Sequence, residues 1–164
     1  MNIRPMQASD WSQVTKIYTE GIAGRNATFE TTVPDWELWD EKHLTVGRLV
    51  AEDTSGIILG WVALSAVSHR FVYRGVTENT IYIATDAQGQ GVGSALLQAL
   101  IDASEAAHIW TILAVTFEEN TASIALHQKF GFRMVGYRER IAQLDGIWRN
   151  TVMMERRSKV VGNE

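Results

Sequence analysis

The chain has 164 residues, 46% of them hydrophobic, with six Trp, five Phe and four Tyr. This length and composition suit one globular domain over residues 1–164 and argue against disorder. A formal net charge of −4 disfavours nucleic acid and anionic membranes as partners. Because there is no cysteine, disulfides, thiolate metal sites and cysteine nucleophiles are excluded.

Targeting and metal signals are also missing from the sequence. No apolar run reaches the roughly 20 residues that a membrane-spanning helix needs. The first residues, MNIRPMQASD, lack the charged-then-apolar order of a signal peptide. His43, His69 and His108 show no metal-ligand spacing. We therefore expect a soluble cytoplasmic protein without a metal.

The first part of the chain predicts a strand, two helices and a hairpin. A strand at residues 3–6 precedes a helix that Ser9 or Asp10 caps and whose apolar residues recur at helical spacing. Pro34 opens a second helix that runs to about residue 44. The runs RLVAE and IILGWVALSAV, joined by the turn DTSG, predict two antiparallel strands.

The second part alternates strands and helices and ends in a hairpin. Its elements are a strand at 79–85, a helix at 91–107, a strand at 110–117, a helix from Asn120 or Thr121 to about 130, and strands at 132–144 and 147–155. Asp145 and Gly146 favour a two-residue turn between the last two strands. The whole order predicts an α/β fold in which a mixed central sheet of about seven strands is flanked by about four helices.

Three glycines at alternate positions stand where a strand turns into a helix, in YIATDAQGQGVGSALL. Glycine lets a phosphate approach the backbone, and a helix N-terminus adds about half a positive charge. The P-loop and dinucleotide patterns both fail, because Ser94 stands where the first needs lysine and the second needs glycine. A tight turn that binds nothing is the alternative.

The spacing Gln88-x-x-Gly91-x-Gly93 resembles the cofactor loop of the GCN5-related N-acetyltransferases (GNAT). ENTASIALHQKFGF is similar to the later part of that family's cofactor site, where the preceding strand and the helix diverge and leave a slot for the pantetheine arm. NATFET, TENTIYI and DGIWRN resemble the phosphinothricin and methionine sulfoximine acetyltransferase branch. The resemblance covers most of the chain. It implies the GNAT fold and acetyl-coenzyme A (acetyl-CoA) as co-substrate.

The resemblance also implies cofactor-binding residues. These are Gln88, Gly89, Gln90, Gly91, Val92, Gly93 and Ser94 in the loop, the strand residues Ile81, Tyr82 and Ile83, and Asn120 and Ser123 in the later segment. The strand residues would act through their backbone. Asn120 is also expected to cap its helix, and Ser123 has the simpler interpretation of a solvated helix residue.

Two residues are candidates for proton transfer. The branch places its general base at Glu78, although a Glu at the start of a strand is commonly just solvated. His127 falls where many relatives have a tyrosine that protonates the leaving thiolate, and it is equally a candidate for a structural contact.

Three residues are candidates for substrate binding. Arg74 offers a planar fork for a carboxylate, and Phe29 and Tyr73 offer apolar walls. The alternative for Arg74 is an exposed loop cation with no partner.

The resemblance implies transfer of an acetyl group to the amino group of a small amino acid-like compound. Without a cysteine, attack is expected to be direct, in a ternary complex. The segments ATDAQGQ and SAVSHRFVYRG depart from the branch and leave the natural amine open. The branch is typically dimeric, so we expect a homodimer, with Trp148 as one possible contact. The alternatives are acetylation of protein N-termini or polyamines, and a non-catalytic acyl-CoA-binding module.

Overall fold

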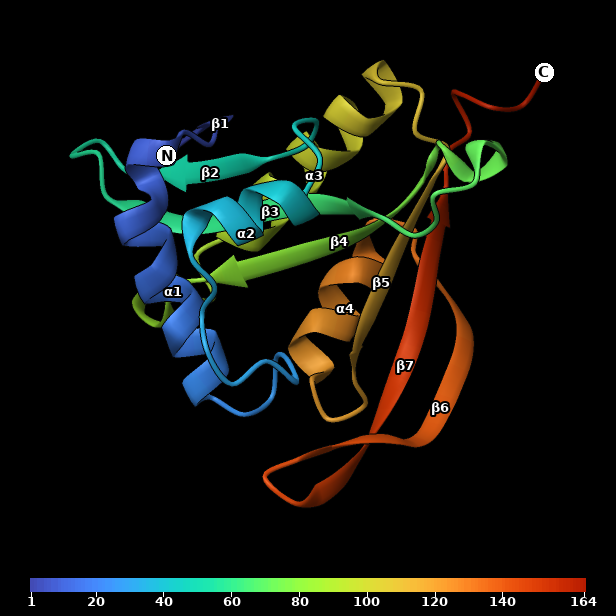
Figure 1. Ribbon diagram of the computed structural model, residues 1–164. Coiled ribbons are helices and arrows are strands. Elements are labelled where there is room, and N and C mark those ends of the chain that lie inside the picture. The colour runs from blue at the N-terminus through green and yellow to red at the C-terminus, as the bar shows by residue number, and fades with distance from the viewer.

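The computed structural model describes residues 1–164 as a seven-stranded sheet with helices on both faces (Figure 1). The strands are β1 (Asn2–Pro5), β2 (Leu49–Glu52), β3 (Ile58–Ala66), β4 (Val76–Ile83), β5 (Thr111–Phe117), β6 (Arg133–Leu144) and β7 (Ile147–Arg157). The helices are α1 (Trp11–Ala23), α2 (Trp36–Lys42), α3 (Val92–Ala106) and α4 (Thr121–Lys129), with short 3-10 turns at η1 (Ala8–Asp10), η2 (Phe71–Tyr73) and η3 (Thr85–Ala87). The predicted order of strands and helices is confirmed.

The strands lie in the order β1-β2-β3-β4-β5-β7-β6. Neighbours pair antiparallel throughout, except for β4 and β5, which pair in parallel. A parallel pair needs a long crossover, and α3 supplies it. The segment between these two strands therefore includes both the glycine loop and the helix that follows it.

The alternation of side chains along β3 assigns the helices to opposite faces of the sheet. Trp61 contacts Trp39 of α2 and Tyr18 of α1, with ring centroids 5.6 and 5.4 Å apart. Gly60, the preceding residue, faces Leu96 of α3. Figure 1 shows the same arrangement, with α2 in front of β3 and α3 behind it. Ser65 lies four residues after Trp61 and so faces α1 and α2.

Two helix ends differ in detail from the prediction. Asp10 stands at the N-cap position of α1, but its carboxylate makes no capping bond to that helix and instead accepts two hydrogen bonds from Arg4 at 2.8 Å. The second helix ends at Lys42 rather than near residue 44. Arg48 donates to the carbonyl oxygens of Asp40, His43 and Leu44 around this helix end, and the Asp40 carbonyl oxygen also accepts from the backbone N–H of His43.

The last hairpin forms as predicted. Asp145 and Gly146 have φ angles of +51° and +77°, the left-handed pair that a type I′ turn requires. β7 pairs with β5, β6 forms the edge of the sheet, and the tip of the hairpin extends beyond the end of β5 (Figure 1).

The apolar faces of the helices pack against the sheet and form the hydrophobic core with it. Its fully buried side chains include Trp39, Trp61, Leu96, Leu100 and Met154. No helix combines the length and the apolar character that crossing a membrane would require.

Candidate active site

The site is built around the point where β4 and β5 separate. They pair over three residues on each strand, from Val76 with Thr111 to Glu78 with Leu113, and then spread apart (Figure 1). From Asn79 to Ile83, β4 keeps its pairing with β3 but has no partner on its other side. Backbone groups of this segment that point into the gap are therefore available to a ligand with amide groups.

The side chain of Asn79 lies at the point where the two strands separate. Its Nδ2 donates to the carbonyl oxygen of Leu113 at 2.9 Å and so replaces the next bond of the ladder. Its Oδ1 lies 3.1 Å from Nε2 of His127, which ties helix α4 to the fork. Asn79 is buried, so all of these polar atoms need partners, and the contacts supply them.

The glycine loop presents free donors. No backbone N–H from Gln88 to Ser94 donates to an acceptor within the chain. Gly91 stands at the N-cap position of α3 with φ +83°, and as a glycine it has no side chain to cap the helix. A run of unpaired N–H groups at a helix N-terminus fits an anionic phosphate chain, as the acetyl-CoA pyrophosphate requires.

The three glycines have different roles. Gly89 and Gly91 have positive φ angles, both line the cleft, and a Cβ at either would meet no atom within 4 Å. Gly93 is helical, and a Cβ there would lie 3.1 Å from Leu126 of α4. Gly93 therefore permits the close approach of α3 and α4, whereas Gly89 and Gly91 add no side chain to the cleft.

A single cleft of about 1550 Å³ joins the loop, the fork and the inner face of α2. This exceeds the usual volume of roughly 300–1,000 Å³ for a small-molecule site, which leaves room for a long cofactor together with an acceptor. The predicted site residues that line it are Phe29, Glu78, Ile81, Tyr82, Ile83, Gln88, Gly89, Gly91, Val92, Gly93, Ser94, Asn120, Ser123 and His127. The structure thus brings fourteen predicted residues together.

Glu78 lies in this cleft at the last residue pair before the fork. It is the register partner of Ser65, and because cross-strand partners share a face, its side chain faces α1 and α2. Burial raises the pKa of the Glu78 carboxyl, and the positive charge of Arg138 opposes the rise. A carboxylate that binds its proton more tightly than usual is suited to accept one from a substrate.

His127 is buried, with 3% of its surface exposed. Both ring nitrogens face protein oxygens: Nδ1 lies 2.8 Å from the Ser123 carbonyl oxygen and Nε2 lies 3.1 Å from Oδ1 of Asn79. Burial lowers the pKa of the imidazole, and the bond to Ser123 opposes this effect. The geometry makes His127 a structural tie in the cleft wall, and its role as a proton donor to the thiolate stays a prediction.

Asn120 caps α4, as the sequence predicts. Its Oδ1 accepts from the backbone N–H of Ser123 at 3.2 Å, and its Nδ2 donates to the carbonyl oxygen of Asn26 at 3.0 Å. The second contact ties the loop after α1 to α4. A contact between Asn120 and the cofactor stays a prediction.

Three predicted residues do not line the cleft. Gln90 turns back, and its Nε2 donates to the Asp86 carbonyl oxygen at 2.7 Å. Tyr73 lies in η2 with much of its side chain in solvent. The Arg74 guanidinium stacks on Phe71 and Trp110, at 4.4 and 5.2 Å, and lines a separate hollow beside the C-terminus.

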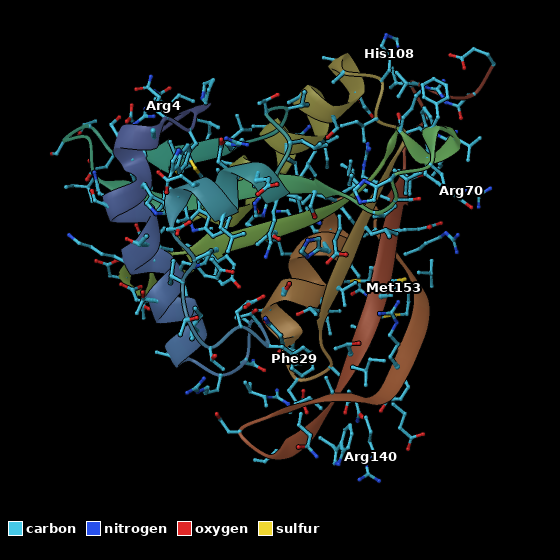
Figure 2. The ribbon with its side chains drawn as sticks, viewed as in Figure 1. Arg4, Phe29, Arg70, His108, Arg140 and Met153 are labelled. Carbon is cyan, nitrogen blue, oxygen red and sulfur yellow. The ribbon has the colours of Figure 1, made fainter.

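Phe29 is also separated from the other two predicted substrate contacts, Tyr73 and Arg74. Phe29 packs on Phe117, at the end of β5, while Arg74 packs on Trp110, just before its start. Figure 2 shows Phe29 and Arg70, which precedes η2, at opposite ends of β5. Seven residues of extended chain span about 23 Å, more than a small amino acid can bridge. Phe29 and Arg74 therefore cannot both contact one such substrate in this chain.

Sequence reasoning missed several residues of the cleft, among them Asn79, Lys42, His43 and Lys129. Asn79 directly follows Glu78 in a strand where a buried polar residue is unusual, and this could have identified it. Lys42 and His43 reach the site from α2, and no local pattern relates that helix to β4. Lys129 donates to Oγ of Ser94 at 3.2 Å, so its charge lies beside the loop.

Replacing Gly91 with alanine tests the loop. The new Cβ would add a side chain to the cleft at the loop of free N–H groups, so we expect acetyl-CoA affinity to fall at least tenfold, or about 1.4 kcal/mol. Gly56 is a matched control, because it has φ +81° and equally open surroundings in the β2–β3 turn. Both alanines cost about 1–2 kcal/mol of backbone strain, but only Gly91→Ala should weaken binding in calorimetric titration. Equal affinity of the two variants would remove Gly91 from the site.

Comparisons with known proteins agree with this geometry. The family model described as Acetyltransferase (GNAT) family matches residues 11–132. A phosphinothricin N-acetyltransferase of Alcaligenes faecalis is 35% identical over 160 residues, which cover 94% of this chain and 81% of the relative. The L-methionine sulfoximine/L-methionine sulfone acetyltransferase of Pseudomonas aeruginosa is 29% identical over 159 residues, or 94% of this chain and 92% of the relative.

A solved structure is also similar over nearly the whole chain. The phosphinothricin acetyltransferase of Sinorhizobium meliloti in complex with acetyl-CoA superposes with a TM-score of 0.89 at 30% identity, covering 99% of this chain and 91% of that one. The match includes the strand, loop and helix that form the fork and the free N–H groups. The chain belongs to the acetyltransferase (GNAT) family and is an N-acetyltransferase whose acetyl donor is acetyl-CoA.

Proposed function

We propose that the protein acetylates the amino group of a small amino acid-type substrate of the phosphinothricin or methionine sulfoximine class, by direct attack in a ternary complex. The observation that carries the proposal is Glu78, a carboxyl group of raised pKa in the cleft at the fork of β4 and β5. The names of the similar proteins support the substrate class.

Each part of the cleft has a distinct task in this reaction. Acetyl-CoA, when bound, supplies an acetyl group activated as a thioester. The N–H groups of residues 88–94 hold its phosphates, and the unpaired side of β4 holds the amides of its arm. The amine reaches the fork from the α1 and α2 face, where Glu78 accepts its proton. No cysteine exists to form an acetyl-enzyme, so the amine attacks the thioester itself.

Thiol release tests the proposed function. Purified protein, acetyl-CoA and a panel of amino acids, sulfoximines, polyamines and N-terminal peptides are mixed and free thiol is followed. We expect release with phosphinothricin or methionine sulfoximine. Release only with peptides or polyamines would favour the other acetyltransferase classes. Thermal stabilisation by acetyl-CoA without thiol from any amine would identify a non-catalytic binding module.

The homodimer is part of the proposal. β6 is an edge strand, and the β6–β7 hairpin exposes large apolar side chains: Met134, Val135, Tyr137, Ile141, Ile147 and Trp148. An exposed edge with an apolar face favours pairing with another chain. A second copy of the hairpin would cover both features. In such a dimer each subunit is one domain, residues 1–164.

Replacing Glu78 with glutamine tests the proton acceptor. The amide keeps the size of the side chain but cannot take a proton, so turnover should fall about 10²-fold or more. Acetyl-CoA affinity should stay nearly unchanged, because Glu78 faces the acceptor side. Steady-state kinetics and calorimetry measure the two quantities. Turnover within twofold of the wild type at neutral pH would show that the amine loses its proton to solvent.

Two cations are candidates for holding the substrate carboxylate. Arg74 is the one that the family resemblance implies, and Lys42 lines the cleft on its α2 side, whereas Lys129, which also lines the cleft, lies beside the glycine loop. We expect Lys42→Ala to reduce kcat/KM for the amino acid by about 1.5–3 kcal/mol, the range for a charge-assisted hydrogen bond. When the substrate carboxylate is converted to an amide, kcat/KM of the wild type should already be low, and Lys42→Ala should lower it little further. If Arg74→Ala gives this pattern instead, η2 must approach the cleft during the reaction.

Replacing Trp148 with glutamate tests the dimer. A charge among the exposed apolar side chains near the tip of the hairpin should shift the sedimentation coefficient from that of a dimer to that of a monomer. Val160, which is 71% exposed near the C-terminus, gives the control Val160→Glu, expected to stay dimeric. A wild-type protein that sediments as a monomer at micromolar concentration would contradict the proposal.

A further inference from the structure

His43 reaches the acceptor side of the cleft from the residue after α2. The next residue, Leu44, donates its backbone N–H to the carbonyl oxygen of Leu64 on β3, at 2.8 Å. Ser65 follows Leu64 and is the register partner of Glu78. His43 is thus anchored one residue from the strand position that pairs with Glu78, and both side chains line the same cleft.

The hydrogen bond of His43 fixes its tautomer. Nδ1 lies 2.7 Å from the carbonyl oxygen of Trp39. A carbonyl oxygen can only accept, so Nδ1 carries the proton and Nε2 carries a lone pair. Nε2 has no hydrogen-bond partner in the chain, and it is not one of the polar atoms sealed from solvent. The cleft therefore contains a nitrogen that can accept a proton.

The ring is held rigidly in this orientation. It stacks on Trp39 with ring centroids 4.2 Å apart and an interplanar angle of 22°. Trp39 is 1% exposed and packs on Trp61 of β3. On the other side of the helix end, Arg48 bonds to the His43 carbonyl oxygen at 2.7 Å. A fixed ring loses little freedom when a substrate meets its lone pair.

The charges around His43 keep the imidazole neutral. Burial lowers its pKa, the bond to Trp39 opposes this, and the positive charges of Arg48 and Lys42 lower it further. Asp40 pairs with Arg48 and offsets part of that charge. Across the cleft, Glu78 and Tyr82 are the titratable groups on β4 that face the same side. At neutral pH the lone pair on Nε2 is therefore free.

We propose that His43 is a second proton acceptor of the reaction: its Nε2 takes one proton from the ammonium group of the substrate, and Glu78 takes the second proton from the same nitrogen once the amine has attacked the thioester. The proposal rests on the proposed acetylation of an amine. One N–H bond of the ammonium breaks, its electron pair stays on the amine nitrogen, and the proton bonds to Nε2. The imidazolium then passes that proton to water in the open cleft.

Two variants separate this role from packing alone. His43→Phe keeps the flat ring that stacks on Trp39 but has no nitrogen, and His43→Gln keeps a polar side chain without a basic nitrogen. His69, an exposed histidine outside the cleft, gives the control His69→Gln. Acetyl-CoA affinity, measured by calorimetry, reports whether each variant keeps the fold and the cofactor half of the cleft.

We expect both His43 variants to bind acetyl-CoA as the wild type does and to lose at least about tenfold in kcat, within the range for acid–base groups. The acid side of their kcat–pH profiles should contain one ionisation fewer than that of the wild type and of His69→Gln. A kcat within twofold of the wild type would overturn the proposal. So would a lower kcat with an unchanged pH profile, because this would assign His43 to packing. If the wild type releases no thiol with any amine, the proposed function fails instead.

Nitrogen NMR of the histidines in the wild-type protein provides a measurement that needs no variant. We expect His43 at neutral pH to carry its proton on Nδ1, and its Nε2 signal to move when phosphinothricin is added to the CoA complex. The signal of His69 should stay in place. A proton on Nε2 at neutral pH, or no response of Nε2 to the amine, would overturn the proposal.

Discussion

The separation of β4 from β5 after three paired residues is the constraint on which the rest of the site depends. A buried strand normally pairs on both sides, because an unpaired backbone group costs free energy. Here the unpaired side of β4 faces the cleft, where a ligand can pair with it. At the point where the strands separate, the Asn79 side chain donates a hydrogen bond to the carbonyl oxygen of Leu113. Its contact with His127 fixes α4 beside the fork. The gap is thus held open by specific bonds.

The fold was predictable because each element carries its own local signal. Asp145-Gly146 favours one turn type, and the structure has the φ angles of that turn. The glycine loop was identified from three residues whose spacing relates them to a strand and a helix, and the cleft includes all three. Local patterns failed where a contact between two elements decides the geometry. Asp10 looks like a helix cap, yet its carboxylate accepts two hydrogen bonds from Arg4 of β1.

The substrate side was the least predictable part of the site for the same reason. Arg74 lies four residues before Glu78 in sequence, which suggested a shared role, but its guanidinium stacks on Phe71 and Trp110 outside the cleft. Lys42 and His43, which line the same cleft as Glu78, come from the end of α2, more than 30 residues earlier in the chain. Contacts of α2 and the residues just after it with distant segments, such as Trp39 with Trp61 and Leu44 with Leu64, place the helix on this face of the sheet. No pattern in the sequence around Glu78 predicts these contacts.

Burial of the acceptor side has opposite effects on its two proton acceptors, and together these effects suit the reaction. A low-dielectric surrounding disfavours the charged form of each group, so it raises the pKa of Glu78 and lowers that of His43. The Glu78 carboxylate thus binds a proton more tightly than it would in water, and the His43 imidazole keeps its lone pair at neutral pH. Each group can therefore accept a proton in the reaction that we propose. The stack of Trp61, Trp39 and His43 provides the low-dielectric surrounding of the histidine, so the packing that stabilises the fold also adjusts the chemistry of the site.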